Sequence, residues 1–277
     1  MCILFTFVGV KPTLTLLAHR ELYAYRTIGF SPDWLVLESY EWLQVWDVTE
    51  AGFTGRGGVD LPRGYATCSE KFIMGGRLYT QFNSDDPTNV YSDDIAPILQ
   101  ITGNYGYLVG AVDNRLVYVK GTSSGKYQVD MYRVEENQLH VRHTLMPPEA
   151  YVSSSISVCQ HPTTGWLAVT QYNTLDIYNG RYEHQVHVTL EHNSCWHNLA
   201  AVRGLIVVGS EHHLSFYTWS GALMGHVNTT DLGVSNTTDL SVSKDLIQGV
   251  GRAGESRVAV AVGSGDFVRD LFLFTLL

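Results

Sequence analysis

The sequence has little charge, few cysteines and no sustained helical pattern. Lys, Arg, Asp and Glu make up 16% of its 277 residues, against about 25% in an average soluble domain. Disordered chains, coiled coils and long surface helices need more charge than this, which excludes those classes. Hydrophobic residues reach 45%, enough for a large buried core without disulfides or metals.

Positive charge is scarce and scattered. The formal net charge is -9 and no run of basic residues occurs, so we expect no nucleic-acid partner. The first ten residues are apolar, but no basic segment precedes them and they are too few to span a bilayer. We therefore expect a cytoplasmic protein without a membrane partner, with an unusual secretory start as the alternative.

The cysteines are few and far apart. They form neither a CxxC pair nor the spacing of a zinc ribbon, and they are Cys2, Cys68, Cys159 and Cys195. The interpretation is free thiols in a reducing compartment rather than a disulfide framework.

Short segments rich in Val, Ile, Leu, Tyr and Trp alternate with clusters of Gly, Pro, Asn and Asp, the pattern of strands and turns. One hairpin pattern recurs, in which an apolar residue is followed nine residues later by a leucine that opens the return strand. Its four copies are Trp34–Leu43, Tyr107–Leu116, Trp166–Leu175 and Leu205–Leu214. Looser copies cover residues 14–25, 72–78 and 246–262.

The anchors between Leu43 and Val258 are on average 43 residues apart, which suits four short strands per unit, the period of a propeller blade. The interval from Leu116 to Leu175 is 59 residues. It predicts a long outer hairpin or an inserted strand pair over residues 127–145.

We predict an all-β fold, a single β-propeller of four-stranded antiparallel blades that covers residues 1–277. Six blades fit best and seven are the alternative. Residues 271–277 are predicted to pair with the N-terminal segment as a closing strand, because a closed ring buries the strand edges that each blade exposes.

Two segments resemble WD40-like β-propellers, a superfamily that grades into NHL and kelch repeats. Leu43-Gln44-Val45-Trp46-Asp47 resembles the family's strand ending in Trp-Asp, and Phe30-Ser31-Pro32-Asp33 resembles its preceding turn. Other copies carry Tyr178-Asn179 and Tyr217-Thr218 at that place. The resemblance implies a non-catalytic scaffold or substrate-recognition domain that binds a protein partner. We also expect a monomer.

Two enzyme-like patterns are interpreted as turns. Gly121-Thr122-Ser123-Ser124-Gly125 fits GxSxG, and residues 249–254 fit GxGxxG. Each mechanism needs a helix directly after the motif, whereas the residues that follow have the character of strands. We therefore expect no catalytic residue and no cofactor.

Metal sites are also not expected. Eight of the eleven histidines lie between His161 and His226, but a metal needs converging ligands. His184 and His187 have opposite parity in a strand and should point to opposite faces. Asp85-Asp86 and Asp93-Asp94 lack the spacing of an EF-hand and suit a solvated loop.

Residues near the start of each inner strand should line the central channel, where propellers present ligand groups. They are the candidate binding residues Tyr65, Thr67, Tyr151, Trp196, His197 and Asn198. A carbohydrate-binding protein and a calcium-dependent hydrolase that uses this channel remain the alternative functions. Trp34 and Trp166 share one position of the hairpin pattern, which favours packing between blades.

Overall fold

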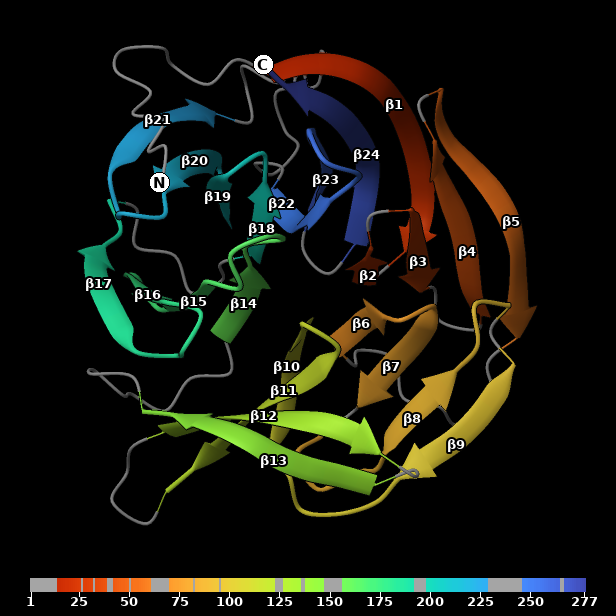
Figure 1. Ribbon diagram of the computed structural model, residues 1–277. Coiled ribbons are helices and arrows are strands. Elements are labelled where there is room, and N and C mark those ends of the chain that lie inside the picture. The colour runs from red at the N-terminus through yellow and green to blue at the C-terminus, as the bar shows by residue number, and fades with distance from the viewer. Residues whose placement is uncertain are drawn as a thin grey trace.

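The chain folds into six four-stranded antiparallel sheets arranged as a six-bladed β-propeller (Figure 1). The computed structural model describes residues 14–25, 27–31, 33–38, 42–49, 51–60, 70–81, 83–94, 96–122, 127–135, 138–146, 156–191, 198–228, 246–264 and 267–277. These residues contain no helix. The predicted all-β class and the choice of six blades are confirmed.

Each blade runs from an inner to an outer strand. Blade 1 consists of β2 (Thr27–Phe30), β3 (Trp34–Glu38), β4 (Trp42–Thr49) and β5 (Gly52–Asp60). Blade 2 consists of β6 (Glu70–Met74), β7 (Arg77–Gln81), β8 (Thr88–Tyr91) and β9 (Pro97–Ile101). Blade 3 consists of β10 (Tyr107–Val112), β11 (Arg115–Gly121), β12 (Tyr127–Glu135) and β13 (Gln138–Leu145). Blade 4 consists of β14 (Ile156–Gln160), β15 (Leu167–Gln171), β16 (Thr174–Tyr178) and β17 (His184–Thr189). Blade 5 consists of β18 (Asn198–Val202), β19 (Leu205–Ser210), β20 (His213–Thr218) and β21 (Leu223–Asn228). Blade 6 consists of β22 (Leu246–Arg252), β23 (Arg257–Ser264), β24 (Phe267–Leu276) and β1 (Leu14–Tyr25).

Blade 6 closes the ring with strands from both ends of the described chain. Three of its strands come from residues 246–276, and the outermost one is β1. The register pairs Leu14 with Leu276 and Arg20 with Leu271. The C-terminal segment therefore pairs with the N-terminal part as the sequence suggested, while the extent of the domain over residues 1–277 stays a prediction.

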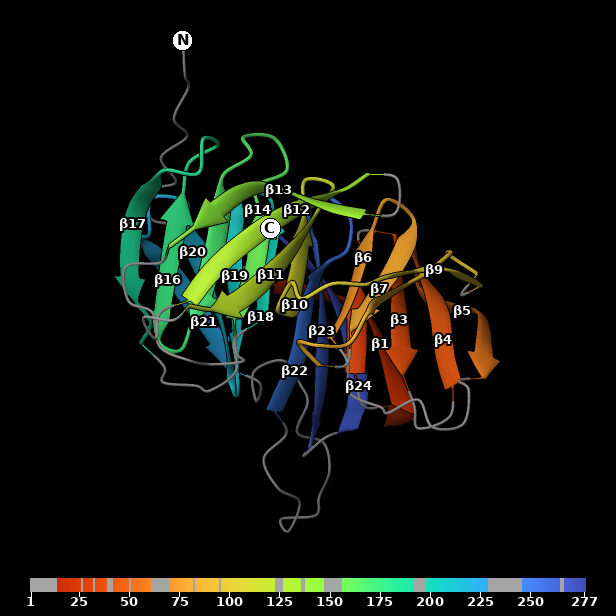
Figure 2. The same cartoon turned by 90° about the horizontal axis from the view of Figure 1, so that it is seen from below.

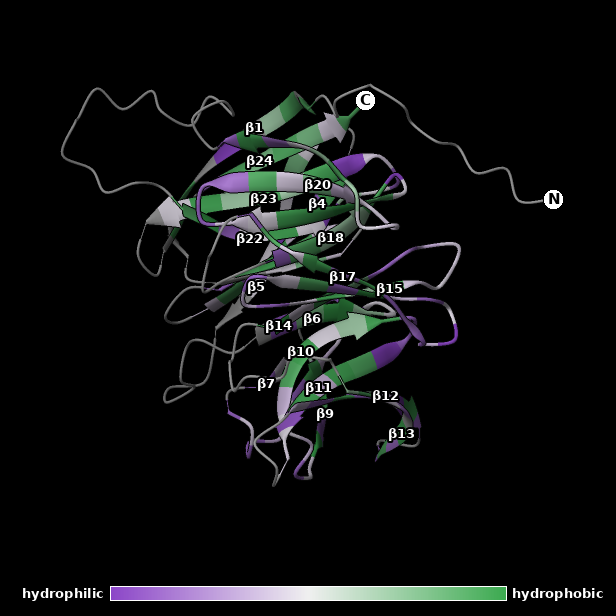
Figure 3. Ribbon diagram, turned by 90° about the vertical axis from the view of Figure 1, so that its left-hand side faces the viewer, coloured by the Kyte–Doolittle hydropathy of each residue, from purple (hydrophilic) through white to green (hydrophobic). Residues whose placement is uncertain are grey.

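The hydrophobic core consists of six clusters, one at each interface between neighbouring blades. Strands in the middle of a blade are consequently buried on both faces, and every residue of β3, β15 and β16 is buried. Figure 2 shows the strands crossing the thickness of the ring, and Figure 3 shows apolar residues along them. Trp34 lies in the cluster between blades 1 and 2, and Trp166 packs against the cluster between blades 4 and 5, as predicted.

Polar side chains also connect the blades. Gln81 of blade 2 donates to the Gly106 carbonyl at 3.0 Å and accepts from the Leu108 amide of blade 3 at 2.7 Å. Arg203 of blade 5 donates to the Leu276 carbonyl of blade 6 at 2.6 Å. Such cross-blade bonds satisfy buried backbone groups and fix the position of one blade on the next.

Two details of the hairpin pattern were wrong. Residues 14–25 form one continuous strand, β1, and not a hairpin. The copy Tyr107–Leu116 joins the first and second strands of its blade, whereas the other three copies join the second and third. The third strand of blade 3 is β12, so residues 127–145 are its outer hairpin, one of the two predicted options.

The outer strand of every blade carries a β-bulge in its pairing with the third strand. A bulge inserts one extra residue, which increases the local twist and reverses the alternation of side chains beyond it. The third strand shows a polar residue, an apolar residue and an aromatic residue at this place in five blades. These triplets are Gln44-Val45-Trp46, Asn89-Val90-Tyr91, Asp130-Met131-Tyr132, Asp176-Ile177-Tyr178 and Ser215-Phe216-Tyr217.

Candidate functional site

The inner strands surround a central cavity of about 740 Å³. All six blades contribute to its lining, through Phe30, Phe72, Val112, Val158, Ala200 and Val250 among others. Turn residues that follow β2, β10 and β14 also line it. The ionisable groups of the lining are Lys71, Asp113, Cys159, His161 and Arg252.

Lys71 is the most deeply buried of these groups. Its ammonium forms an ion pair with Glu38 of blade 1, and both side chains are almost fully buried. Burial lowers the pKa of Lys71 below that of a solvated lysine. The ion pair joins blades 1 and 2. Because Glu38 neutralises Lys71, the only buried cation of the described lining, the pair offers no net charge to a ligand.

His161 begins the turn between β14 and β15. Its Nδ1 accepts the backbone N–H groups of Thr163 at 3.2 Å and Thr164 at 3.3 Å, and its ring lies edge-on to Trp219 of blade 5 at 5.2 Å. Burial and the positive charge of Arg252 lower the pKa of His161. The neutral imidazole therefore stabilises the turn, and its Nδ1 lone pair is already used.

Cys159 is buried in the interface between blades 4 and 5. Burial raises the pKa of its thiol well above the usual range, so the reactive thiolate is disfavoured. Cys2, Cys68 and Cys195 lie outside the described residues.

Asn198 is the one candidate binding residue that the structure describes. It begins β18, the inner strand of blade 5, and lines the central cavity. The other five candidates, Tyr65, Thr67, Tyr151, Trp196 and His197, lie outside the described residues. Their role in the channel remains a prediction.

One of the two enzyme-like patterns lies within the described residues. GxGxxG spans the end of β22 and the turn to β23, and Gly251 packs where a Cβ would overlap the ring of Phe30. This glycine therefore lets two inner strands approach closely. Residues 123–125 of the GxSxG pattern lie outside the described residues, and the next element is strand β12.

The two aspartate pairs of blade 2 lie in separate turns and not in one loop, because strand β8 runs between them, and they use their carboxylates locally. Asp86 accepts the backbone N–H and the side-chain amide of Asn83, both at 3.0 Å. Asp93 pairs with Arg56 of blade 1 at 3.5 Å, and Asp94 accepts hydrogen bonds from Ser92 and the Ala96 amide. The carboxylates thus serve separate turns and one link between blades.

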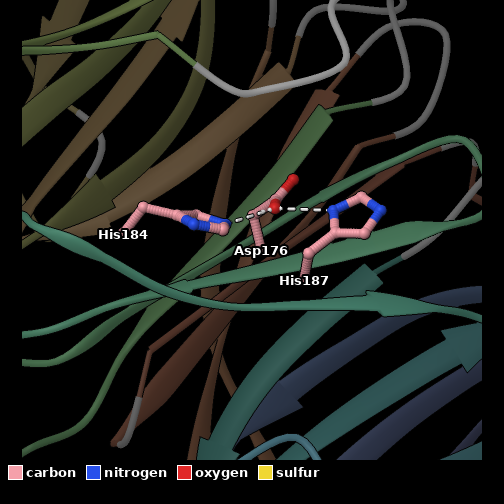
Figure 4. A group of neighbouring side chains, drawn as sticks. All are labelled: Asp176, His184 and His187. Carbon is pink, nitrogen blue, oxygen red and sulfur yellow. Dashed lines mark hydrogen bonds and ion pairs between the residues drawn. The ribbon is translucent and has the colours of Figure 1, made fainter.

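One group of potential metal ligands converges in the described residues, on the outer half of blade 4. His184 Nε2 and His187 Nδ1 lie 2.8 and 2.9 Å from the same oxygen, Oδ1 of Asp176 (Figure 4). The prediction that the two histidines face opposite sides was wrong. β17 pairs Val186 with Ile177 and His184 with Tyr178, so Gln185 is an extra bulge residue that brings both rings to one face.

No protein-family model matches the chain, and no curated protein matches it. In the parts of the chain that the structure describes, no helix is long and apolar enough to cross a membrane.

Proposed function

We propose that this protein is a non-catalytic protein-interaction module in which the propeller ring presents its turns to a protein partner. The observation that carries the proposal is the chemistry of the central cavity. Its described lining holds a single carboxylate, Asp113, while Lys71 is neutralised, Cys159 is inert and His161 is engaged in a turn. A calcium-dependent hydrolase would need several converging oxygen ligands there.

The architecture supports the same conclusion. A closed ring with six apolar interfaces and polar links between blades holds its turns in fixed positions, and such preorganisation favours binding because little order has to be gained. The place of Leu43-Gln44-Val45-Trp46-Asp47 on the third strand β4 supports kinship with WD40-like or NHL-like repeats. We further propose that the protein is a cytoplasmic monomer.

A binding experiment tests this function. We expect the full chain to capture a protein partner saturably, and Arg252→Glu at the rim of the cavity to weaken that binding at least about tenfold. Arg133→Glu, on the exposed outer hairpin of blade 3, is the matched control and should bind as the wild type does.

Biolayer interferometry against the captured partner gives the dissociation constants of the wild type and of the two variants. A chain that captures no saturable protein, or that instead binds glycans on an array or hydrolyses esters only with calcium, would reject the proposal.

A further inference from the structure

The metal-ligand geometry of blade 4 emerges from a comparison of equivalent positions in the six blades. The middle of the third strand holds Gln44, Asn89, Asp130, Asp176, Ser215 and, in β24, Phe272. On the outer strand, the residues directly opposite are Gly58, Gln100, Thr144, His187, His226 and His19. The residues on the other side of the bulge are Gly55, Pro97, Val141, His184, Leu223 and Leu16.

Blade 4 alone among the six combines a carboxylate with an imidazole on both sides of the bulge. A neutral imidazole nitrogen and a carboxylate oxygen are ligands that Zn²⁺ takes in proteins. The bulge at Gln185 is what aligns them, because it places His184 and His187 on the face of β17 that looks toward Asp176. The three potential ligand atoms all lie within 4.8 Å of one another.

The distances need only a small adjustment. Both imidazole nitrogens donate to Asp176 Oδ1, at 2.8 and 2.9 Å. A tetrahedral zinc ion with bonds of about 2.0–2.1 Å holds its ligand atoms about 3.3 Å apart. The rings would therefore move outward by about 0.5 Å, which is open to them because their side chains are 37% and 33% exposed.

Protons also balance without a redox step. In the present geometry each neutral ring uses its proton on the nitrogen that faces Asp176, since a carboxylate only accepts. To bind a metal, each ring moves that proton to its other nitrogen, and the freed lone pair becomes the ligand. Asp176 keeps its charge and exchanges two hydrogen bonds for one metal bond.

One buried polar atom at this place supports a further occupant. The hydroxyl of Tyr178, on the same face of β16, is buried and has no hydrogen-bond partner among the described residues. Unsatisfied buried polar atoms indicate that an ion or a water completes the site.

We propose that Asp176, His184 and His187 bind one divalent zinc-type metal ion, with solvent at the fourth position. The ion joins β16 to the outermost strand β17 on the rim of the propeller, away from the central cavity. The site is therefore independent of the proposed partner-binding function.

Zinc titration of the full chain tests the proposal. Protein without a histidine tag, treated with EDTA and dialysed, should bind one Zn²⁺ with a dissociation constant of about 1 µM or lower. His184→Gln and His187→Gln should each raise that constant at least about 100-fold. Substitution with Co²⁺ should give the visible absorption of a tetrahedral site in the wild type and lose it in both variants.

His226→Gln is the matched control, because His226 faces Ser215 in blade 5 as His187 faces Asp176 in blade 4. It should leave the zinc affinity unchanged, and circular dichroism should show that all three variants keep the wild-type fold. The proposal is overturned if the wild type shows no saturable binding up to about 100 µM Zn²⁺. It is equally overturned if His226→Gln and His187→Gln weaken binding to the same extent.

Discussion

Blades 3 and 4 hold a buried aspartate at the same place in the third strand but surround it with different partners. Asp130 on β12 accepts Gln128 Nε2 at 2.8 and 2.7 Å, Thr144 Oγ1 at 2.6 Å and the Tyr132 hydroxyl at 3.3 Å. Asp176 on β16 is as deeply buried but accepts hydrogen bonds from two imidazole rings on a single oxygen.

The difference shows how the outer strand decides what a buried carboxylate does. In blade 3 the donors are an amide and two hydroxyls, which satisfy both oxygens and are poor ligands for zinc. In blade 4 the residue equivalent to Gln128 is Thr174, whose hydroxyl donates to the Gln171 carbonyl at 2.8 Å instead. Asp130 is thus part of a closed structural network, whereas Asp176 faces groups that can change from donor to ligand.

The largest expected effect comes from giving blade 3 the residues of blade 4. The triple variant Gln128→Thr, Val141→His, Thr144→His places imidazoles on both sides of the β13 bulge. It also removes the Gln128 amide that donates hydrogen bonds to Asp130. We expect this chain to bind a second Zn²⁺, an affinity gain of at least about 100-fold at that blade. Isothermal titration calorimetry measures the stoichiometry.

The single variant Val141→His is the control for this transplant. It supplies one imidazole beside an aspartate that is still satisfied, so its stoichiometry should stay that of the wild type. A triple variant that folds and still binds no second ion would show that convergence around the carboxylate is insufficient for a site.

The next effect concerns stability without metal. Asp130→Asn replaces a charged acceptor with an amide, whose NH2 group then faces the hydrogen-bond donors that surround Asp130. We expect it to lower the free energy of unfolding by about 2 to 3 kcal/mol. Asp176→Asn should cost less than about 1 kcal/mol, because the partly exposed imidazoles can bond to water instead. Urea unfolding in EDTA compares the two variants.

Equal losses of stability in these two variants would show that the imidazoles hold Asp176 as firmly as the network holds Asp130. Adding zinc sharpens the comparison further. It should raise the stability of Asp130→Asn as it does that of the wild type, and it should leave Asp176→Asn unchanged, because only the folded state with an intact site gains from the ligand.

The fold could be predicted because its signals are local and repeated. Apolar strand segments, turn residues and the spacing of leucine anchors give four-stranded units, and ring closure follows from the need to bury strand edges. The pattern was misplaced by one strand in blade 3, because Leu116 on β11 lies nine residues after Tyr107 just as Leu175 does after Trp166. The repeated triplets Asp130-Met131-Tyr132 and Asp176-Ile177-Tyr178 would have aligned the third strands correctly.

The metal-ligand geometry of blade 4 could not be predicted from alternation alone. His184 and His187 differ in parity, and only the bulge residue Gln185 brings them to one face. A bulge depends on the twist between the outer strand and its neighbour, which is a property of the sheet and leaves no residue signature in β17. The recurrence of this bulge in all six blades can be seen only from the residue pairing between the third and outer strands.

The smallest effect separates the two tyrosines that follow the aspartates. The Tyr132 hydroxyl donates to Asp130 and its ring contacts Tyr105 and Tyr118 at 5.2 and 5.4 Å, while the Tyr178 hydroxyl is buried without a partner among the described residues. Tyr132→Phe should lower the free energy of unfolding by about 0.5 to 1 kcal/mol, because the carboxylate loses one donor.

Tyr178→Phe should instead stay within about 0.5 kcal/mol of the wild type in EDTA, since it removes a hydroxyl whose burial is not compensated by a hydrogen bond. Both substitutions keep the ring and its packing, so paired urea curves isolate the hydroxyl. A loss in Tyr178→Phe as large as in Tyr132→Phe would mean that the Tyr178 hydroxyl already bonds to ordered water in the metal-free protein. The difference between Asp130, whose oxygens are both satisfied, and Asp176 would then depend on the imidazoles alone.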